Sequence, residues 1–201
     1  MNLVELILDE EQLNSGVDAI SVVRDPAIES NFVALKNHKV EFKTLDKEKR
    51  ILLGALLIPN KPIIRNQELR GVKQKFYCYF SKDTVEKASQ WYLKKGNQSN
   101  ATLEHKMTLN GLTLVESWIK VDATHDKSLA YGLDEPIGTW FGAIKVDNEA
   151  IWTDFVKTGK VRGFSIEGFF ADKAIQASAV KKTKLELIKE AILDYHKHIN
   201  L

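Results

Sequence analysis

The chain contains one cysteine and four prolines and carries almost no net charge, and these shortages exclude several classes of protein. A single cysteine, Cys78, excludes an internal disulfide framework and a metal cage made of thiolates from one chain. Lys and Arg number 29 against 27 Asp and Glu, so nucleic acid is not the expected partner. No apolar run approaches the ~20 residues of a membrane-spanning helix, and the N-terminus lacks the pattern of a secretory signal. We therefore expect an intracellular, soluble protein.

The residues that are present are typical of one globular domain. The 201 residues are 44% hydrophobic and 28% charged, which is enough apolar material for a single core. Short β-rich runs at 3–8, 50–58, 74–80 and 161–170 predict strands. Ser81 begins one helical pattern that closes at Gly96, and Asn148 begins a second that closes at Gly159. We expect an α+β protein with a small, mainly antiparallel β-barrel-like core surrounded by helices.

Two further stretches bear on domain organisation. Residues 173–199 contain neither Gly nor Pro, and their apolar residues recur at three- and four-residue steps, which predicts a C-terminal helix. The polar stretch 36–50 is typical of a solvated loop or an edge hairpin. The predicted organisation is thus a domain over residues 1–172 and a helical appendage over 173–201.

Residues 101–120 form two alternating runs joined by Asn110-Gly111, a pair that is typical of a type I′ hairpin turn. Counting outward from that turn places His105 opposite Glu116 on an otherwise apolar face. Most such pairs are core histidines satisfied by an acid. A carboxylate removed from water is costly unless it is well paired, however, and an acid behind an imidazole is the support that a general base needs. The pair is therefore a candidate catalytic pair without a nucleophile.

The strand predicted at 161–170 contains a serine. Alternation places Phe164 and Ile166 on one face and Gly163, Ser165 and Glu167 on the other. The sequence is not the Gly-x-Ser-x-Gly elbow, because its second glycine lies one position late and no helix follows at once. A serine in a strand is usually only a small polar residue, so this motif alone does not identify a nucleophile.

Seven separated blocks of the chain, in the same order, resemble the XkdF-type phage prohead maturation serine proteases: Ser21–Glu29, Gly54–Pro62, Asn100–His105, Glu116–Ile119, Asp126–Ser128, Gly138–Trp140 and Arg162–Gly168. The likeness spans roughly residues 17–170. The family is related to the herpesvirus assemblin proteases, and the resemblance implies a small β-barrel surrounded by helices. It also implies cleavage of scaffold, of capsid-protein extensions and of the protease itself inside the procapsid, in the host cytoplasm.

The resemblance places the catalytic histidine on His105 and the nucleophilic serine on Ser165. It does not place the third member, because related enzymes use a histidine or an acid there. The hairpin register independently nominates Glu116, and we prefer it to three other acids: Glu167, Asp122 and Asp126. The implied chemistry is acyl transfer, with no metal or organic cofactor.

The same resemblance implies the partners. Phage scaffold and major capsid protein are the expected substrates, and a homodimer is suggested by analogy with the herpesvirus enzymes. Neither nucleic acid nor a membrane is required. One departure from the family pattern is Lys106, which stands where many relatives have an acid after the histidine.

Two alternatives compete with the protease hypothesis. A metal-dependent hydrolase could use His105 with the nearby set Asp122, His125 and Asp126. A non-catalytic capsid-assembly module could use the C-terminal helix to bind scaffold. Cys78 is interpreted as a core thiol, because it shares a strand face with Phe76 and Phe80. The four tryptophans are interpreted as packing residues.

Overall fold

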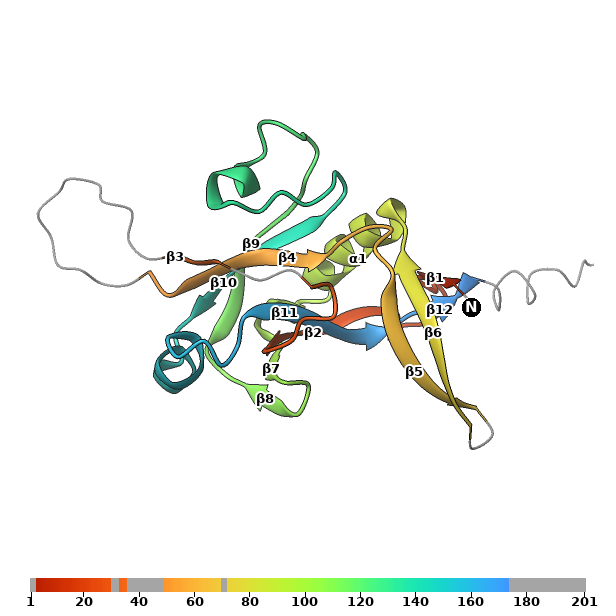
Figure 1. Cartoon of the computed structure of the whole chain (residues 1–201), viewed down its shortest axis with the longest axis horizontal. Coiled ribbons are helices and arrows are strands. Elements are labelled where there is room, and N and C mark those ends of the chain that lie inside the picture. Colours follow the sequence, from red (N-terminus) through yellow and green to blue (C-terminus); the bar gives the residue numbers. More distant parts are fainter. Residues whose placement is uncertain (1–2, 30–32, 36–48, 70–71, 174–201) are drawn as a thin grey trace, which may run out of the picture.

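A computed structural model describes residues 3–29, 33–35, 49–69 and 72–173, and these form three four-stranded sheets (Figure 1). The first sheet has the order β12 (Ala171–Asp172), β1 (Leu3–Ile7), β6 (Val72–Phe80), β5 (Ile63–Leu69). The second has the order β3 (Val33–Leu35), β4 (Ile51–Leu57), β10 (Trp140–Val146), β9 (Leu112–Ile119). The third has the order β11 (Gly163–Phe169), β2 (Gly16–Val23), β7 (Ala101–Leu103), β8 (Met107–Leu109).

Helices are few in the described residues. The longest is α1 (Lys82–Lys94), and the others are single turns: the 3₁₀ turns η1 (Asn97–Ser99) and η2 (Lys127–Tyr131), the short α2 (Glu149–Ile151) and the π-type turn η3 (Trp152–Val156). The mixed α+β class agrees with the sequence prediction. The described strands do not close into a barrel, and the described helices do not surround one. The predicted C-terminal helix and most of the polar stretch 36–50 lie outside the described residues.

Both helical patterns read from the sequence form at the expected places. The Ser81 hydroxyl caps α1 by accepting from the Thr84 N–H, and Tyr92 is buried on the inner face. The Asn148 side chain caps α2 by accepting from the Ile151 N–H. Gly159, with a φ of +70°, ends the turn that follows. No helix among the described residues is long and apolar enough to span a membrane.

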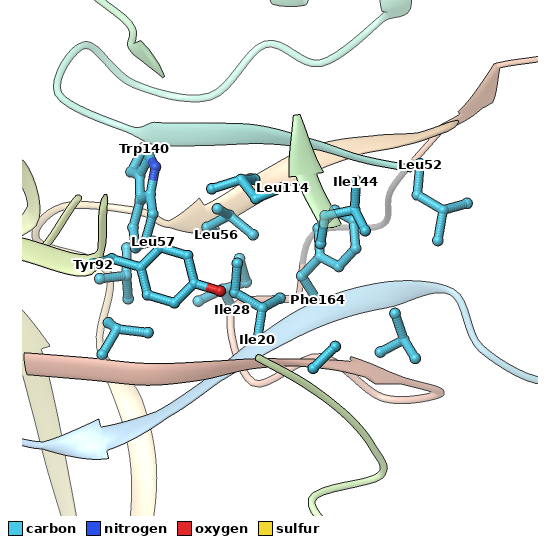
Figure 2. Packing of buried hydrophobic residues seen from close by; sticks show 14 of the residues in the cluster. Ile20, Ile28, Leu52, Leu56, Leu57, Tyr92, Leu114, Trp140, Ile144 and Phe164 are labelled. Carbon is cyan, nitrogen blue, oxygen red and sulfur yellow. The ribbon is translucent and has the colours of Figure 1, made fainter. Parts of the chain in front are cut away.

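Much of the core lies between the second and third sheets (Figure 2), and the same buried cluster includes residues of the first sheet and of α1. Ile20 and Phe164 project into it from β2 and β11, and Leu114 and Ile144 project from β9 and β10. The remaining labelled members are Ile28, Leu52, Leu56, Leu57, Tyr92 and Trp140. Because Ile20 and Phe164 are at most 1% exposed, the alternate residues of β2 and β11 must lie on the opposite face of the third sheet.

The cysteine and tryptophans pack as expected. Cys78 is fully buried, and its thiol lies 3.6 Å from the Ile63 carbonyl oxygen. Trp140 and Trp152 are buried, whereas two others are partly buried against the core, Trp91 and Trp118. These contacts give no reason to assign the thiol or the indoles to a reaction.

The predicted hairpin over residues 101–120 is wrong. β8 pairs with β7 in the third sheet, whereas β9 pairs with β10 in the second. Of the two turn residues only Gly111 has a positive φ, +77°, and a type I′ turn needs a positive φ at both central positions. The Gly111 carbonyl instead accepts from the Asp147 N–H at 2.7 Å. Asn110-Gly111 is therefore a corner between two sheets.

Candidate functional site

His105 lies in the tight turn that joins β7 to β8. Glu104 and His105 both have left-handed backbone conformations, with φ of +53° and +56°, and Lys106 N–H donates to the Leu103 carbonyl oxygen at 3.0 Å. Each left-handed residue that is not glycine costs roughly 1–2 kcal/mol, although histidine is among the side chains found there more often. The surrounding structure must therefore stabilise this turn.

Three contacts fix the turn to the end of β2. The Glu104 N–H donates to the Val22 carbonyl oxygen at 3.1 Å, and the Arg24 N–H donates to Glu104 Oε1 at 2.7 Å. The His105 N–H donates to the Ser21 hydroxyl oxygen at 3.0 Å. Backbone groups in a turn have no partner from the strand ladder, so these contacts satisfy donors that would otherwise be unpaired. These contacts hold the backbone of His105, and so the start of its side chain, in a fixed place beside β2.

Ser165 lies on β11, directly opposite Ser21 of β2. Its neighbours in the strand, Phe164 and Ile166, point toward the core, so Ser165 and Glu167 point to the other face. Ser165 is 7% exposed. Since Cα atoms of opposed antiparallel residues are about 4.5–5.5 Å apart, Ser165 lies one strand away from the residue that binds the His105 backbone.

Glu167 supplies the acid that contacts the His105 ring. Its Oε1 lies 3.1 Å from Nδ1 of His105, and the same oxygen accepts a short hydrogen bond from the Thr102 hydroxyl. Glu167 is opposed on β2 by Ala19, whose methyl side chain leaves room for the longer side chain to cross toward β7. The side chains of His105 and Glu167 are 42% and 33% exposed, so the pair borders solvent.

The contact with Glu167 determines which ring nitrogen of a neutral His105 carries the proton. If Nδ1 donates to Glu167, the lone pair of Nε2 is available to accept a proton from another group. Ser165 and Glu167 are two residues apart on one strand face, which separates their Cα atoms by roughly 6–7 Å. Among the described residues, His105 makes no hydrogen bond to the Ser165 hydroxyl. The Ser165 hydroxyl has no hydrogen-bond partner among the described residues.

Glu116 lies elsewhere. It is on β9, opposite Ala143 of β10, and its carboxylate forms a close ion pair with Lys127. The register that nominated Glu116 depended on the hairpin that does not form, so the geometric reason for that assignment is lost. The acid beside the imidazole is Glu167, which alternation had already placed on the same strand face as Ser165.

The proposed metal-binding set does not assemble around His105. Asp122 accepts from the backbone N–H groups of Thr124 and His125, and these hydrogen bonds lower the pKa of its carboxyl group. Asp126 caps η2. Burial raises the pKa of its carboxyl group. Its hydrogen bonds, led by that from the Ser128 N–H, lower the pKa by more, so the net shift is downward. Within the described ranges, no three His, Cys, Asp or Glu side chains converge as metal ligands would.

Two hydroxyl groups of the site were missed by sequence reasoning, those of Ser21 and Thr102. Each lies within a block that resembles the protease family, but nothing in the local pattern distinguishes either from an ordinary strand residue. Their contacts depend on the pairing of β2 with both β7 and β11, which joins segments about 80 and 140 positions apart. The place of these two hydroxyls in the site is therefore seen only once the order of the strands in the sheet is known.

Comparisons with known proteins supply no independent assignment. No family model, no curated protein and no solved structure matches the chain.

Proposed function

We propose that the chain is a serine endopeptidase in which Ser165 is the nucleophile, His105 the general base and Glu167 the orienting acid. The observation that carries the proposal is the 3.1 Å contact between the His105 ring and the carboxylate two residues beyond Ser165. An imidazole with an acid on one nitrogen and a serine as nucleophile is the combination used for acyl transfer on several unrelated folds.

In the proposed reaction, Ser165 Oγ attacks the carbonyl carbon of a peptide bond while Nε2 of His105 accepts its proton. Glu167 keeps the imidazole in the Nδ1–H tautomer and stabilises the imidazolium that forms. His105 then gives the proton to the leaving amine, and water resolves the acyl-enzyme by the reverse sequence. Each step uses side chains of this chain alone.

The burial of Ser165 sets a condition on this mechanism. A residue that is 7% exposed is reached by a peptide carbonyl only if the groups that cover it move aside on binding. The described state is thus proposed to be a resting state, in which the ring and the acid are already paired and the hydrogen bond to the serine forms with substrate.

The biological role follows from the resemblance of the sequence blocks. We propose that the substrates are phage scaffold and extensions of the major capsid protein, cleaved inside the procapsid in the host cytoplasm. A second copy of the chain is the proposed partner. The C-terminal helix expected from the sequence pattern after residue 172 is part of the same proposal.

The test uses the purified full chain and a fluorophosphonate probe, which forms a bond to activated serines. We expect mass spectrometry to find the label on Ser165, and we expect no label in Ser165→Ala or His105→Ala. Ser99→Ala is the matched control, because Ser99 is an exposed serine whose hydroxyl contacts only Thr113 in the described residues.

Self-cleavage provides the second measurement. The wild-type chain should be nicked slowly on storage, the Ser165→Ala chain should stay intact, and a chelator should change neither result. Chelator-sensitive activity would support a metal-dependent hydrolase instead. A folded chain that is neither labelled nor nicked, even when co-expressed with its scaffold, would contradict the proposal and favour a non-catalytic assembly module.

A further inference from the structure

A row of four hydroxyl side chains crosses the third sheet next to the candidate site. Ser165 of β11 opposes Ser21 of β2, Ser21 is paired with Thr102 of β7, and Thr102 opposes Thr108 of β8. We call these four residues the hydroxyl row. Ser21 is fully buried, and a buried hydroxyl is destabilising unless it forms hydrogen bonds.

The hydrogen bonds of Ser21 lead to the turn that carries His105. Its hydroxyl oxygen accepts from the His105 N–H at 3.0 Å, and the hydroxyl donates to the Thr102 carbonyl oxygen at 3.4 Å. The first bond satisfies the amide of a residue with a left-handed backbone. Because the φ and ψ angles of His105 determine where its ring lies, Ser21 acts on the imidazole through the main chain.

The hydrogen bond of Thr102 leads to the acid. Its hydroxyl donates to Oε1 of Glu167, the same oxygen that contacts Nδ1 of His105. A glutamate has three rotatable side-chain bonds, so a second hydrogen bond at the carboxylate restricts it to the orientation that meets the ring. Thr102 thus acts on the imidazole through Glu167.

We propose that Ser21 and Thr102 are positioning residues of the His105–Glu167 pair. Ser21 holds the backbone under the ring, and Thr102 holds the carboxylate against it. The catalytic meaning of this inference rests on the proposed peptidase function. The positioning itself is a property of the imidazole, and it can be measured in a chain that has no activity.

The experiment uses the full chain with Ser21→Ala and Thr102→Val, which remove the two hydroxyls. Thr102→Ser is the conservative variant, because it keeps the donor. Thr108→Val is the matched control, because Thr108 belongs to the same row but has no described contact with the pair. The readouts are the ¹⁵N NMR signals of the His105 ring and the maximal rate and half-saturating concentration for fluorophosphonate labelling of Ser165.

We expect the wild-type ring to be in the Nδ1–H form and the rings of Ser21→Ala and Thr102→Val to become mixtures of both tautomers. We expect their maximal labelling rates to fall about 10- to 100-fold at unchanged half-saturation, since misplacement by about 1 Å can cost a hundredfold. Thr102→Ser should restore both readouts, and Thr108→Val should change neither.

Ring signals that stay wild-type in both Ser21→Ala and Thr102→Val would overturn the inference. If the wild-type chain is neither labelled nor nicked, the proposed function fails, but the ring signals still decide whether the two hydroxyls position the pair. If Ser21→Ala does not fold, Thr102→Val decides alone, because Val keeps the branched shape of Thr and removes only the hydroxyl that donates to Glu167.

Discussion

Nδ1 of His105 lies 3.1 Å from Oε1 of Glu167, although the two residues are 62 positions apart in the sequence. The contact joins a turn of one hairpin to a strand at the far edge of the same sheet, across β2. It replaces the cross-strand pairing with Glu116 that the alternation pattern suggested. Which acid supports the imidazole is therefore a question that two matched variants can answer.

Glu167→Gln should lower the rate of fluorophosphonate labelling by roughly a hundredfold or more, and Glu116→Gln should leave it near the wild-type value. An amide in place of Glu167 can donate to Nδ1 and so favours the wrong tautomer, which is very costly in enzymes of this type. The Glu116 carboxylate binds Lys127 on a different sheet. Equal losses in both variants would contradict this assignment.

Gly168→Ala should destabilise the fold by about 3 kcal/mol or more, because overpacking at a backbone contact cannot relax. A Cβ at Gly168 would overlap the Gly16 carbonyl oxygen and lie 2.9 Å from the Val17 Cα. Gly96→Ala is the control: its φ is +74° but its Cβ meets nothing within 4 Å, so only the strain of about 1–2 kcal/mol remains. Urea unfolding of both variants measures the difference, and similar losses would show that the close approach is not what matters.

Thr139→Val should stabilise the protein by about 1 kcal/mol. Within the described part of the chain, the hydroxyl of this fully buried residue has no hydrogen-bond partner, so valine removes an unsatisfied group at nearly constant shape. Thr84→Val makes the same chemical change where the hydroxyl lies 3.0 Å from the Ser81 hydroxyl, and it should be destabilising. Thermal unfolding shows whether each variant is more or less stable than the wild type, and a loss of stability in Thr139→Val would contradict the prediction.

The contact between Glu5 and Lys173 should make stability fall in acid. The hydrogen bond from Lys173 lowers the pKa of Glu5 below its ordinary value of 4.5, although burial opposes the shift. A group whose pKa is lower in the folded state contributes stability above its unfolded pKa and loses it as the pH falls through the folded one. The melting temperature of the wild type should therefore fall more steeply below about pH 4.5 than that of Glu5→Gln. Parallel curves would contradict the assignment.

Local signals in the sequence predicted the elements that local interactions stabilise. Ser81 and Asn148 both cap helices where the pattern placed them, because a cap acts within three residues of its own position. The strands at 3–8, 50–58, 74–80 and 161–170 also form, since each alternates or is continuously apolar over its own length.

The connection between β7 and β8 could not be predicted in the same way. Its two left-handed residues are Glu104 and His105, a pair that is not a usual turn signal, and the conformation is held by groups of β2 and of Arg24 some 80 positions earlier. The Asn110-Gly111 pair, which does signal a hairpin, forms a corner because the backbone at Asp147 supplies another partner for Gly111. Tertiary contacts decided both cases.

Among the site residues, too, local patterns predicted some positions and tertiary contacts determine the others. Ser165 and Glu167 share a strand face by simple alternation, so the sequence could place the acid beside the serine. It could not bring the imidazole to that face, because this requires the parallel pairing of β2 with β7 in the middle of the sheet. The choice of Glu116 rested on a hairpin register that does not form, and no signal near Glu116 itself points to Glu167 instead.

Because Ser165 and Glu167 lie two residues apart on the same strand, their backbone spacing is set by β11 itself. The imidazole belongs to a different segment, the three-residue turn between β7 and β8. A distortion of the turn at residues 104–106 would therefore move the imidazole relative to the other two groups, whereas Ser165 and Glu167 would keep their spacing along β11.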